Sequence, residues 1–329
     1  NWALFKMLMR DNDWVAANTR KVSPRGKLTV EIIDPVSTRY RTPEECVLLD
    51  PVRDANPFFH LYEALWILAG FEDVSRISRY AKHISTFSDD GKTFFGSYGA
   101  RMRHRFGVDQ VSRVVDLLRT DPDSRRAVIG LWNPSDLQID KTLDLPCNTT
   151  LYFKVRDGAL NMTVCNRSND AIWGCYGANA VHFSILQQYI AGSLGVKVGG
   201  YHQVSDSLHV YLNSESSVVW DRVKLEPLTL LQYYSYAARG LTNTSLLVDR
   251  ETFDAELTFL LRSGDGRIAF EKYEEPFLQN VVVPMFRAFE LYKSEQLDTA
   301  VTILERSTEV WHVAGLEWIQ RRAAARRKS

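Results

Sequence analysis

The chain has 329 residues, 45% of them hydrophobic and 24% charged, and its 40 basic side chains balance its 40 acidic ones. This is the composition of an ordinary globular protein that is long enough to bury a core. Neutral net charge disfavours a surface built for polyanions, and no apolar run reaches the roughly 20 residues that span a bilayer. We therefore expect neither a membrane protein nor a partner of nucleic-acid polymers.

The cysteines are too few and too scattered for a disulfide framework or a paired zinc motif; they are Cys46, Cys147, Cys165 and Cys175. Residues 1–6 lack the pattern of a signal peptide. These features predict a cytoplasmic protein with reduced thiols and no metal site. No repeat or flexible linker divides the chain, so the simplest division is a catalytic domain at 1–215 and a mostly helical extension at 216–329 packed on the same unit.

The first expected elements are a strand at 27–33 and a helix at 57–69, which has apolar residues all round and is therefore expected to be buried. Further strands are expected at 126–132 and 149–155, where β-branched and aromatic residues are frequent. Arg156-Asp157-Gly158 then supplies a turn, after which residues 159–165 return as the second strand of a hairpin.

The second half of the chain is expected to be largely helical. Apolar spacing predicts a helix at 178–194, ending near Gly192 and Gly195. Later candidates are helices at 253–262, 275–293 and 296–326. The final basic residues, which include Arg321, Arg322 and Arg326, are expected to form a solvated tail, with partner binding as the alternative. Together these patterns predict an α+β layered fold, a mixed β-sheet covered by helices, with a helical C-terminal extension.

Cys147 is the best candidate for chemistry, because it lies in a short loop directly ahead of the expected hairpin. A cysteine is a nucleophile only when its thiolate is populated, which requires a nearby positive charge or hydrogen-bond donor. Arg125, Arg126 and Arg167 are the candidate cations, and with Ser168 they would also suit a phosphate. The alternatives are a packed cysteine and, for the adjacent Arg125 and Arg126, a pair of surface charges.

Glu63 is a second anomaly, because it lies in a helix without an evident polar face. Burial raises the pKa of a carboxyl toward neutrality, which suits a residue that shuttles protons; the alternative is a half-exposed glutamate paired with a local arginine. His209 and Tyr211 alternate along an expected strand and so face the same side. They could bind a sugar hydroxyl together, or form a packed aromatic pair.

In combination, these residues resemble the thymidylate synthase superfamily, which includes the pyrimidine nucleotide hydroxymethylases. The resemblance covers about residues 15–215 in the family's motif order. Its motifs are Glu63-Ala64-Leu65-Trp66-Ile67-Leu68-Ala69-Gly70, Asp123-Ser124-Arg125-Arg126, Leu131-Trp132-Asn133, Leu145-Pro146-Cys147, Asn166-Arg167-Ser168-Asn169-Asp170, Trp173-Gly174 and Asp206 with His209 and Tyr211. A thymidylate synthase-like fold is the structure that this resemblance implies.

The resemblance also implies roles. Cys147 would add to C6 of a pyrimidine nucleotide, so that C5 accepts a one-carbon unit from 5,10-methylenetetrahydrofolate. Glu63 would organise water and proton transfers, and the other implied catalytic residues are Tyr98, Asn148 and Asp170. Asp170, Trp173 and Gly174 would bind the folate. The implied nucleotide-binding residues are Arg25, Arg125, Arg126, Arg167 and Ser168 at the 5′-phosphate and His209 and Tyr211 at the sugar.

In the family, Arg125 and Arg126 would reach the active site of the neighbouring subunit, so the resemblance implies a homodimer. For the amino-terminal phosphate arginine the sequence offers Arg25 and Arg20, and we choose Arg25, which precedes Gly26. The substrate would be a pyrimidine nucleoside monophosphate.

Departures from the synthase pattern decide which family member this is. Asn148 replaces the usual histidine after the nucleophile, and the uracil-reading asparagine falls on Ala178 in an ungapped alignment or on Asn179 with a one-residue insertion. No tryptophan occurs between Trp66 and Trp132, and the basic C-terminus differs from the short apolar tail of synthases. Without that tryptophan wall, water rather than hydride could attack the C5 methylene, which would give a hydroxymethyl product.

The leading hypothesis from the sequence is a 5-hydroxymethylase of CMP or dCMP. If Asn179 reads the base, a dUMP 5-hydroxymethylase is the better answer, and a variant thymidylate synthase is third. The non-enzymatic alternative is a nucleotide- or RNA-binding regulator with the same fold, which an intact set of Cys147, Glu63 and Asp170 argues against.

Overall fold

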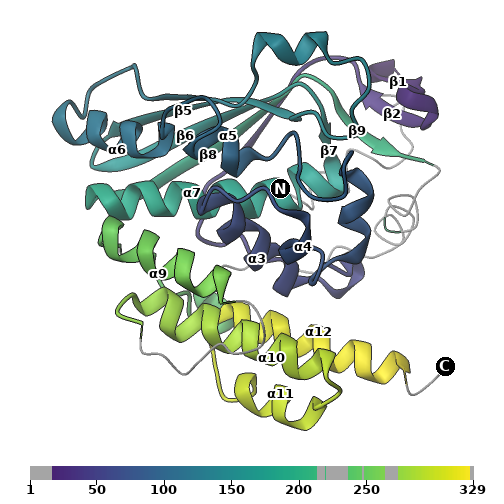
Figure 1. The fold of residues 1–329 in the computed structure, drawn as a ribbon, viewed down its shortest axis with the longest axis vertical. Helices are drawn as coiled ribbons and strands as arrows, with labels where there is room; N and C mark the ends of the chain where they lie inside the picture. The colour runs from purple at the N-terminus through teal and green to yellow at the C-terminus, as the bar shows by residue number, and fades with distance from the viewer. Residues whose placement is uncertain (1–16, 213–218, 220–235, 247, 264–272, 327–329) are drawn as a thin grey trace.

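The computed structural model describes residues 17–212, 219, 236–246, 248–263 and 273–326. Figure 1 shows β-strands in the upper layer, helices α7 (Ala178–Leu194) and α3 (Pro57–Leu68) beneath them, and the C-terminal helices at the bottom. The predicted layered α+β fold with a helical C-terminal extension is therefore confirmed. Among the described residues, no helix has both the length and the apolar character needed to cross a membrane.

The strands form two mixed sheets. In the five-stranded sheet the order is β3 (Val36–Tyr40), β8 (Lys197–Ser205), β6 (Ala159–Asn166), β5 (Asn148–Arg156) and β4 (Val128–Gly130). In the four-stranded sheet it is β1 (Thr19–Val22), β2 (Thr29–Ile32), β9 (Leu208–Tyr211) and β7 (Asn169–Asp170). The predicted strands at 149–155 and 159–165 are confirmed. The strands predicted at 27–33 and 126–132 are observed in shorter form, as β2 and β4. Before β4, Arg126 N–H donates to Ser124 Oγ at 3.4 Å instead of to a neighbouring strand.

The β5–β6 hairpin sets the position of the cysteine. Asp157 and Gly158 have positive φ angles of 52° and 69°, as a tight hairpin turn requires, and glycine adopts such angles without strain. The resulting register pairs Asn148 with Asn166 at the far end of the hairpin. Just beyond that pair, Arg167 N–H donates to the carbonyl of Cys147 at 3.0 Å. The turn therefore brings the cysteine beside the Arg167 segment.

Helices α3 (Pro57–Leu68) and α7 (Ala178–Leu194) confirm the predicted elements at 57–69 and 178–194. Asn56 caps α3 by accepting from Phe59 N–H at 3.1 Å, and α7 ends at Gly195, whose φ is 68°. In α3 only Phe59 and Glu63 are not fully buried. They lie four residues apart, on one side of the helix, so Glu63 lies on the only stripe of α3 that is open to its surroundings.

The remaining helices are arranged around α3 and α7. They are α4 (Val74–Ile77), α5 (Tyr98–Arg103), α6 (Gln110–Thr120), α9 (Arg250–Arg262), α10 (Val283–Lys293), α11 (Leu297–Leu304) and α12 (Val310–Arg326). Short 3-10 turns occur at Pro24–Gly26, Pro51–Arg53, Lys82–Phe87, Pro134–Gln138 and Ala237–Arg239, and π turns at Ala171–Cys175 and Leu278–Val282. The helices predicted at 253–262 and 275–293 are confirmed, the second with its π turn.

The prediction of a single helix at 296–326 is wrong, because the helix is interrupted between α11 and α12. At the break, Ser307 Oγ accepts from Glu309 N–H at 3.0 Å, and the Glu309 carboxylate accepts from Thr244 N–H at 2.9 Å. These polar contacts offer the backbone an alternative to continuing the helix, as serine and other short polar side chains often do.

The extension packs on the side of α3 opposite the sheet (Figure 1). The Phe58 ring lies 5.2 Å from that of Phe289 and 5.6 Å from that of Trp318, centre to centre. The predicted basic tail also needs correction: Arg321 and Arg322 both pair with Asp54, just before α3, the latter at 2.8 Å. They are not simply solvated, because α12 lies close enough to α3 for the pairs to form. Residues 327–329 of the predicted tail lie outside the described residues.

Candidate active site

Cys147 lies at the open end of the hairpin, where Arg167 holds its loop. The Arg167 guanidinium donates from Nε to Pro146 O at 2.9 Å and from Nη2 to Leu145 O at 3.2 Å. Burial raises the pKa of the Cys147 thiol, while the charge of Arg167 and a hydrogen bond from Ser168 oppose the rise. The structure thus brings together three of the predicted residues, a thiol with a cation and a hydroxyl that favour its thiolate.

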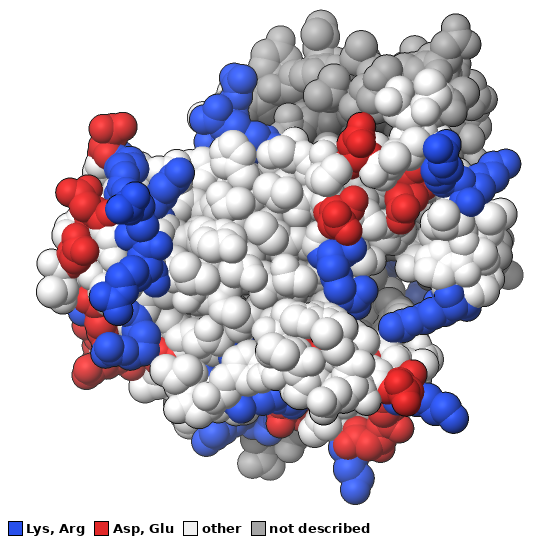
Figure 2. Space-filling model, turned by 90° about the horizontal axis from the view of Figure 1, so that it is seen from above, with Lys and Arg blue, Asp and Glu red and all other residues white. Residues whose placement is uncertain are grey.

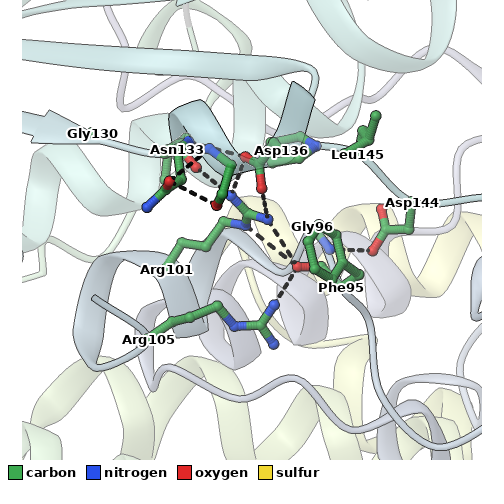
Figure 3. Close-up of polar contacts among 12 residues, drawn as sticks. Phe95, Gly96, Arg101, Arg105, Gly130, Asn133, Asp136, Asp144 and Leu145 are labelled. Carbon is green, nitrogen blue, oxygen red and sulfur yellow. Dashed lines mark hydrogen bonds and ion pairs between the residues drawn. The ribbon is translucent and has the colours of Figure 1, made fainter. Parts of the chain in front are cut away.

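A second set of contacts fixes the segment that leads to Cys147 (Figure 3). Arg101 of α5 is buried and pairs with Asp136 at 2.7 Å, and it also donates to Leu131 O at 2.8 Å. At the other end of the segment, the Asp144 carboxylate accepts from Gly96 N–H at 2.8 Å. Gly96 has no room for a side chain, because a Cβ there would lie 2.9 Å from Asp144 O. The cysteine loop is consequently tied at both ends to the α5 region.

Tyr98 begins α5 and is adjacent to Cys147. Burial, followed by the nearby Cys147 and Asp144, raises the pKa of its phenol well above the usual value. Asn148 is fully buried and donates from Nδ2 to Asn166 Oδ1. Its side chain therefore points behind the cysteine, into the protein.

Glu63 meets a histidine that the sequence analysis missed. Glu63 Oε2 lies 2.8 Å from Nε2 of His182 on α7, and the side chains are 15% and 4% exposed. The alternative of a local arginine partner is therefore wrong, because the neighbouring helix supplies an imidazole instead. His60, one turn before Glu63, has its pKa lowered to about 3, mainly by burial and then by His182, so it stays neutral. The signal that could have identified His182 is its position as a polar residue in the apolar run 178–194. Glu63 was identified by the same kind of signal in α3.

Asp170 carries an open acceptor. One oxygen accepts from Ile172 and Trp173 N–H groups, both at 2.7 Å, whereas Oδ2 is buried with no hydrogen-bond partner among the described residues. Burial raises its pKa, and the two N–H groups, His209 and Arg53 oppose the rise. Trp173 follows at 37% exposure. A buried carboxylate beside an exposed indole can bind a flat ligand that offers N–H donors.

Asn179 is oriented by a second asparagine. It lies in the first turn of α7 and donates from Nδ2 to Asn169 Oδ1 at 3.2 Å. Gly174 packs against this contact so closely that a Cβ would lie 2.4 Å from Asn169 Oδ1 and 3.1 Å from Asn179 Nδ2. Gly174 therefore leaves room for Asn179 to reach Asn169.

The predicted sugar and phosphate groups occupy nearby elements. His209 and Tyr211 share one face of β9 with their rings 5.2 Å apart, as their alternation predicted. Burial raises the pKa of Tyr211, and electrostatic interactions with Asp170 and Cys147 add to the rise. Arg25 extends from its turn to within 3.5 Å of Leu143 O, on the cysteine loop.

Arg125 and Arg126 lie away from the Cys147 of their own chain. The adjoining Ala127 carbonyl accepts from Phe153 N–H at 2.9 Å, six residues along β5 from the cysteine. At the usual strand rise this is a separation of about 20 Å. Both side chains are exposed. The structure therefore does not unite them with Arg167 and Ser168 within one chain.

Comparisons with known proteins agree with this arrangement. A family model described as thymidylate synthase matches residues 13–233. The chain is 40% identical to the "Deoxyuridylate hydroxymethyltransferase" of Pseudomonas phage M6 over 304 residues, 89% of this chain and 85% of that protein. It is 41% identical to the protein of the same name from Bacillus phage SP01 over 62% of this chain and 56% of that protein. A "Putative thymidylate synthase" of Methanothermobacter marburgensis is 35% identical over 57% and 80%.

The family match covers about two thirds of the chain, including every predicted site residue, and the similarity to the M6 protein continues into the extension. Members of this family are one-carbon transferases that use methylenetetrahydrofolate, which excludes a purely nucleotide- or RNA-binding regulator. They act on pyrimidine nucleoside monophosphates and are typically dimers. On its motifs, fold and site together, the chain belongs to the thymidylate synthase family.

Proposed function

We propose that the protein is a deoxyuridylate 5-hydroxymethyltransferase, which places a hydroxymethyl group on C5 of dUMP. The observation that carries the proposal is the 40% identity with the M6 deoxyuridylate hydroxymethyltransferase along 89% of this chain. The leading sequence hypothesis, a cytidine monophosphate, is less well supported than its alternative. That hypothesis depended on Ala178 as the base-reading residue, whereas Asn179 has an amide held in a defined contact with Asn169.

In this proposal the Cys147 thiolate adds to C6 of the pyrimidine, which makes C5 nucleophilic. Arg167, Ser168 and Arg25 bind the 5′-phosphate beside the cysteine. His209 and Tyr211 hydrogen-bond the sugar. Glu63, in contact with His182, takes up and returns protons and holds the water that becomes the new hydroxyl. Tyr98 assists removal of the proton from C5.

The cofactor fits the residues around Asp170. Its buried Oδ2 lacks a donor among the described residues, and Trp173, which is exposed, and Gly174 follow Asp170 three and four residues along the chain. We assign these residues to the folate, because its pterin ring offers N–H donors and a flat face. When bound, methylenetetrahydrofolate supplies the one-carbon unit.

The proposal is tested by incubating the protein with methylenetetrahydrofolate and, separately, dUMP, dCMP and CMP. We expect 5-hydroxymethyl-dUMP and tetrahydrofolate, because addition of water involves no change of oxidation state. Methylated product with dihydrofolate would instead identify a variant thymidylate synthase. Preference for a cytidine nucleotide would overturn the assignment of the base.

The active form in this proposal is a homodimer in which Arg125 and Arg126 bind the phosphate in the partner's site. The face of the five-stranded sheet away from α7 is uncharged at its centre, with Val128 39% and Tyr152 47% exposed, and charged side chains lie around its margin (Figure 2). Such a face suits a second copy of the same sheet. Both arginines then extend from its margin, about 20 Å from their own cysteine.

Mixing two inactive variants tests this arrangement. We expect Cys147→Ala and the double variant Arg125→Ala/Arg126→Ala each to be nearly inactive, and their mixture, after subunit exchange, to recover about one quarter of wild-type activity. Half of the random dimers are mixed, and each mixed dimer has one complete site. The control mixture, Cys147→Ala with Glu63→Gln, has no complete site and should stay inactive. Equal activity in the two mixtures would contradict the shared site.

A further inference from the structure

A row of buried amides runs behind the proposed base-reading residue. Asn179 contacts Asn169, and Asn169 Nδ2 donates to Gln203 Oε1 at 2.7 Å and to Ser205 Oγ at 2.9 Å. Gln203 in turn donates from Nε2 to the Tyr40 hydroxyl at 3.2 Å. An amide has a direction, because its oxygen only accepts and its nitrogen only donates. The orientation of each amide in the row therefore constrains the next.

The direction of the row is set at the Tyr40 end. The Tyr40 hydroxyl hydrogen-bonds the backbone carbonyl of Cys175, which can only accept, so Tyr40 must donate. Burial raises the pKa of Tyr40 well above its usual value, so the hydroxyl keeps its proton. Its oxygen is then the acceptor for Gln203, which must present Nε2 to it. Gln203 Oε1 consequently faces the other way, toward Asn169.

From Gln203 the direction passes to Asn179. Asn169 must present Nδ2 to Gln203 Oε1, which leaves Asn169 Oδ1 facing Asn179 and requires Nδ2 of Asn179 to face it. A second contact agrees: Asn166 Nδ2 lies 3.4 Å from the carbonyl of Val204 and 3.5 Å from Gln203 Oε1. Two backbone carbonyls, at Cys175 and Val204, thus impose the same direction.

The row has little freedom to reverse. Gln203 is 0% and Asn169 1% exposed, so water cannot replace a lost contact. If Asn169 flipped alone, its oxygen would face Gln203 Oε1 at 2.7 Å and its nitrogen would face that of Asn179. Buried like-with-like contacts of this kind are unfavourable. The orientation of Asn179 is therefore fixed before any nucleotide arrives.

We propose that Tyr40, Gln203 and Asn169 form a specificity relay that locks the Asn179 amide in one orientation and so makes the enzyme distinguish uracil from cytosine. Uracil offers an acceptor at O4 and a donor at N3, whereas cytosine offers a donor at the 4-position and an acceptor at N3. A locked amide matches one of these orders, while an amide free to flip matches both. The inference rests on the proposed function for its choice of uracil.

Asn169→Leu tests the relay, because it removes the contacts with Asn179, Gln203 and Ser205 while keeping the branching of the side chain. We expect the ratio of kcat/KM for dUMP to that for dCMP to fall about tenfold or more, as the freed Asn179 amide begins to accept cytosine. The matched control is Gln187→Leu, since Gln187 is also a fully buried amide, bonded to the Leu160 and Gly199 carbonyls and outside the relay. It should lower the melting temperature and leave the ratio unchanged.

A folded Asn169→Leu variant with the wild-type ratio would overturn the relay. If that variant does not fold, Gln203→Leu serves instead, because it separates Asn169 from both backbone carbonyls that set the direction, at Cys175 and Val204; the ratio should again fall, and an unchanged ratio would overturn the relay. A wild-type enzyme that prefers dCMP would overturn only the assignment of uracil. The relay would still predict a reduced preference in the variants.

Discussion

Replacing Cys147 with alanine is expected to abolish hydroxymethyl transfer, with kcat lowered by at least about 10⁴-fold. The sulfur is the proposed nucleophile that adds covalently to C6, whereas the phosphate and sugar contacts lie on other residues. Affinity for dUMP should therefore stay within a few-fold of the wild-type value. Single-turnover assays and equilibrium binding of dUMP measure the two effects separately.

The thiol can also be followed by its pH dependence. Because burial raises the pKa of Cys147, its alkylation by iodoacetamide in the free enzyme should accelerate with pH through the range where an ordinary cysteine has reached its plateau.

For the alanine substitution, Cys46→Ala is the matched control, since Cys46 is buried outside the site; its turnover per folded protein should equal that of the wild type. Measurable turnover by Cys147→Ala would refute the covalent mechanism.

Glu63→Gln is expected to give the second largest loss, about 10²- to 10⁴-fold in kcat. Glutamine keeps the size of the side chain but cannot accept and return a proton, so KM for dUMP should change little. Glu63 Oε2 lies 2.8 Å from His182 Nε2, and a glutamine of the same shape can stay beside the imidazole. Steady-state kinetics across a pH range provide the measurement.

Glu275→Gln distinguishes a catalytic from a structural effect. Glu275 is 5% exposed and accepts from Asp249 N–H at 2.9 Å, in the extension. Because glutamine keeps an oxygen that can accept from Asp249 N–H, the substitution of Glu275 should leave kcat unchanged. A Glu63→Gln enzyme with wild-type kcat would show that proton transfer does not depend on Glu63.

Local patterns predicted most of the fold. The Asp157-Gly158 turn and the glycine that ends α7 are encoded by residues next to one another, so the hairpin and the helix followed from the sequence alone. The break between α11 and α12 did not, because it depends on Glu309 reaching Thr244, 65 residues earlier. Sequence patterns report a distant partner of this kind poorly.

The same distinction applies to the site. Cys147, Arg167 and Ser168 could be expected together because one hairpin carries them, and Glu63 attracted attention as a carboxylate in an apolar helix. The relay could not be predicted from the sequence, because Tyr40, Gln203 and Asn169 come from three strands and no sequence pattern links them. Only the registers of two sheets make them neighbours.

The packing of α3 has a consequence for how the protein unfolds. One side of this helix faces α7, and another is covered by Phe289 and Trp318 of the extension, so that apart from the stripe of Phe59 and Glu63 the helix is buried. A chain shortened to the family boundary near residue 233 would expose Phe58 and lose its ability to hold Glu63 in place. We therefore propose that the catalytic core and the extension unfold as one cooperative unit, and we expect the smallest active enzyme to include both.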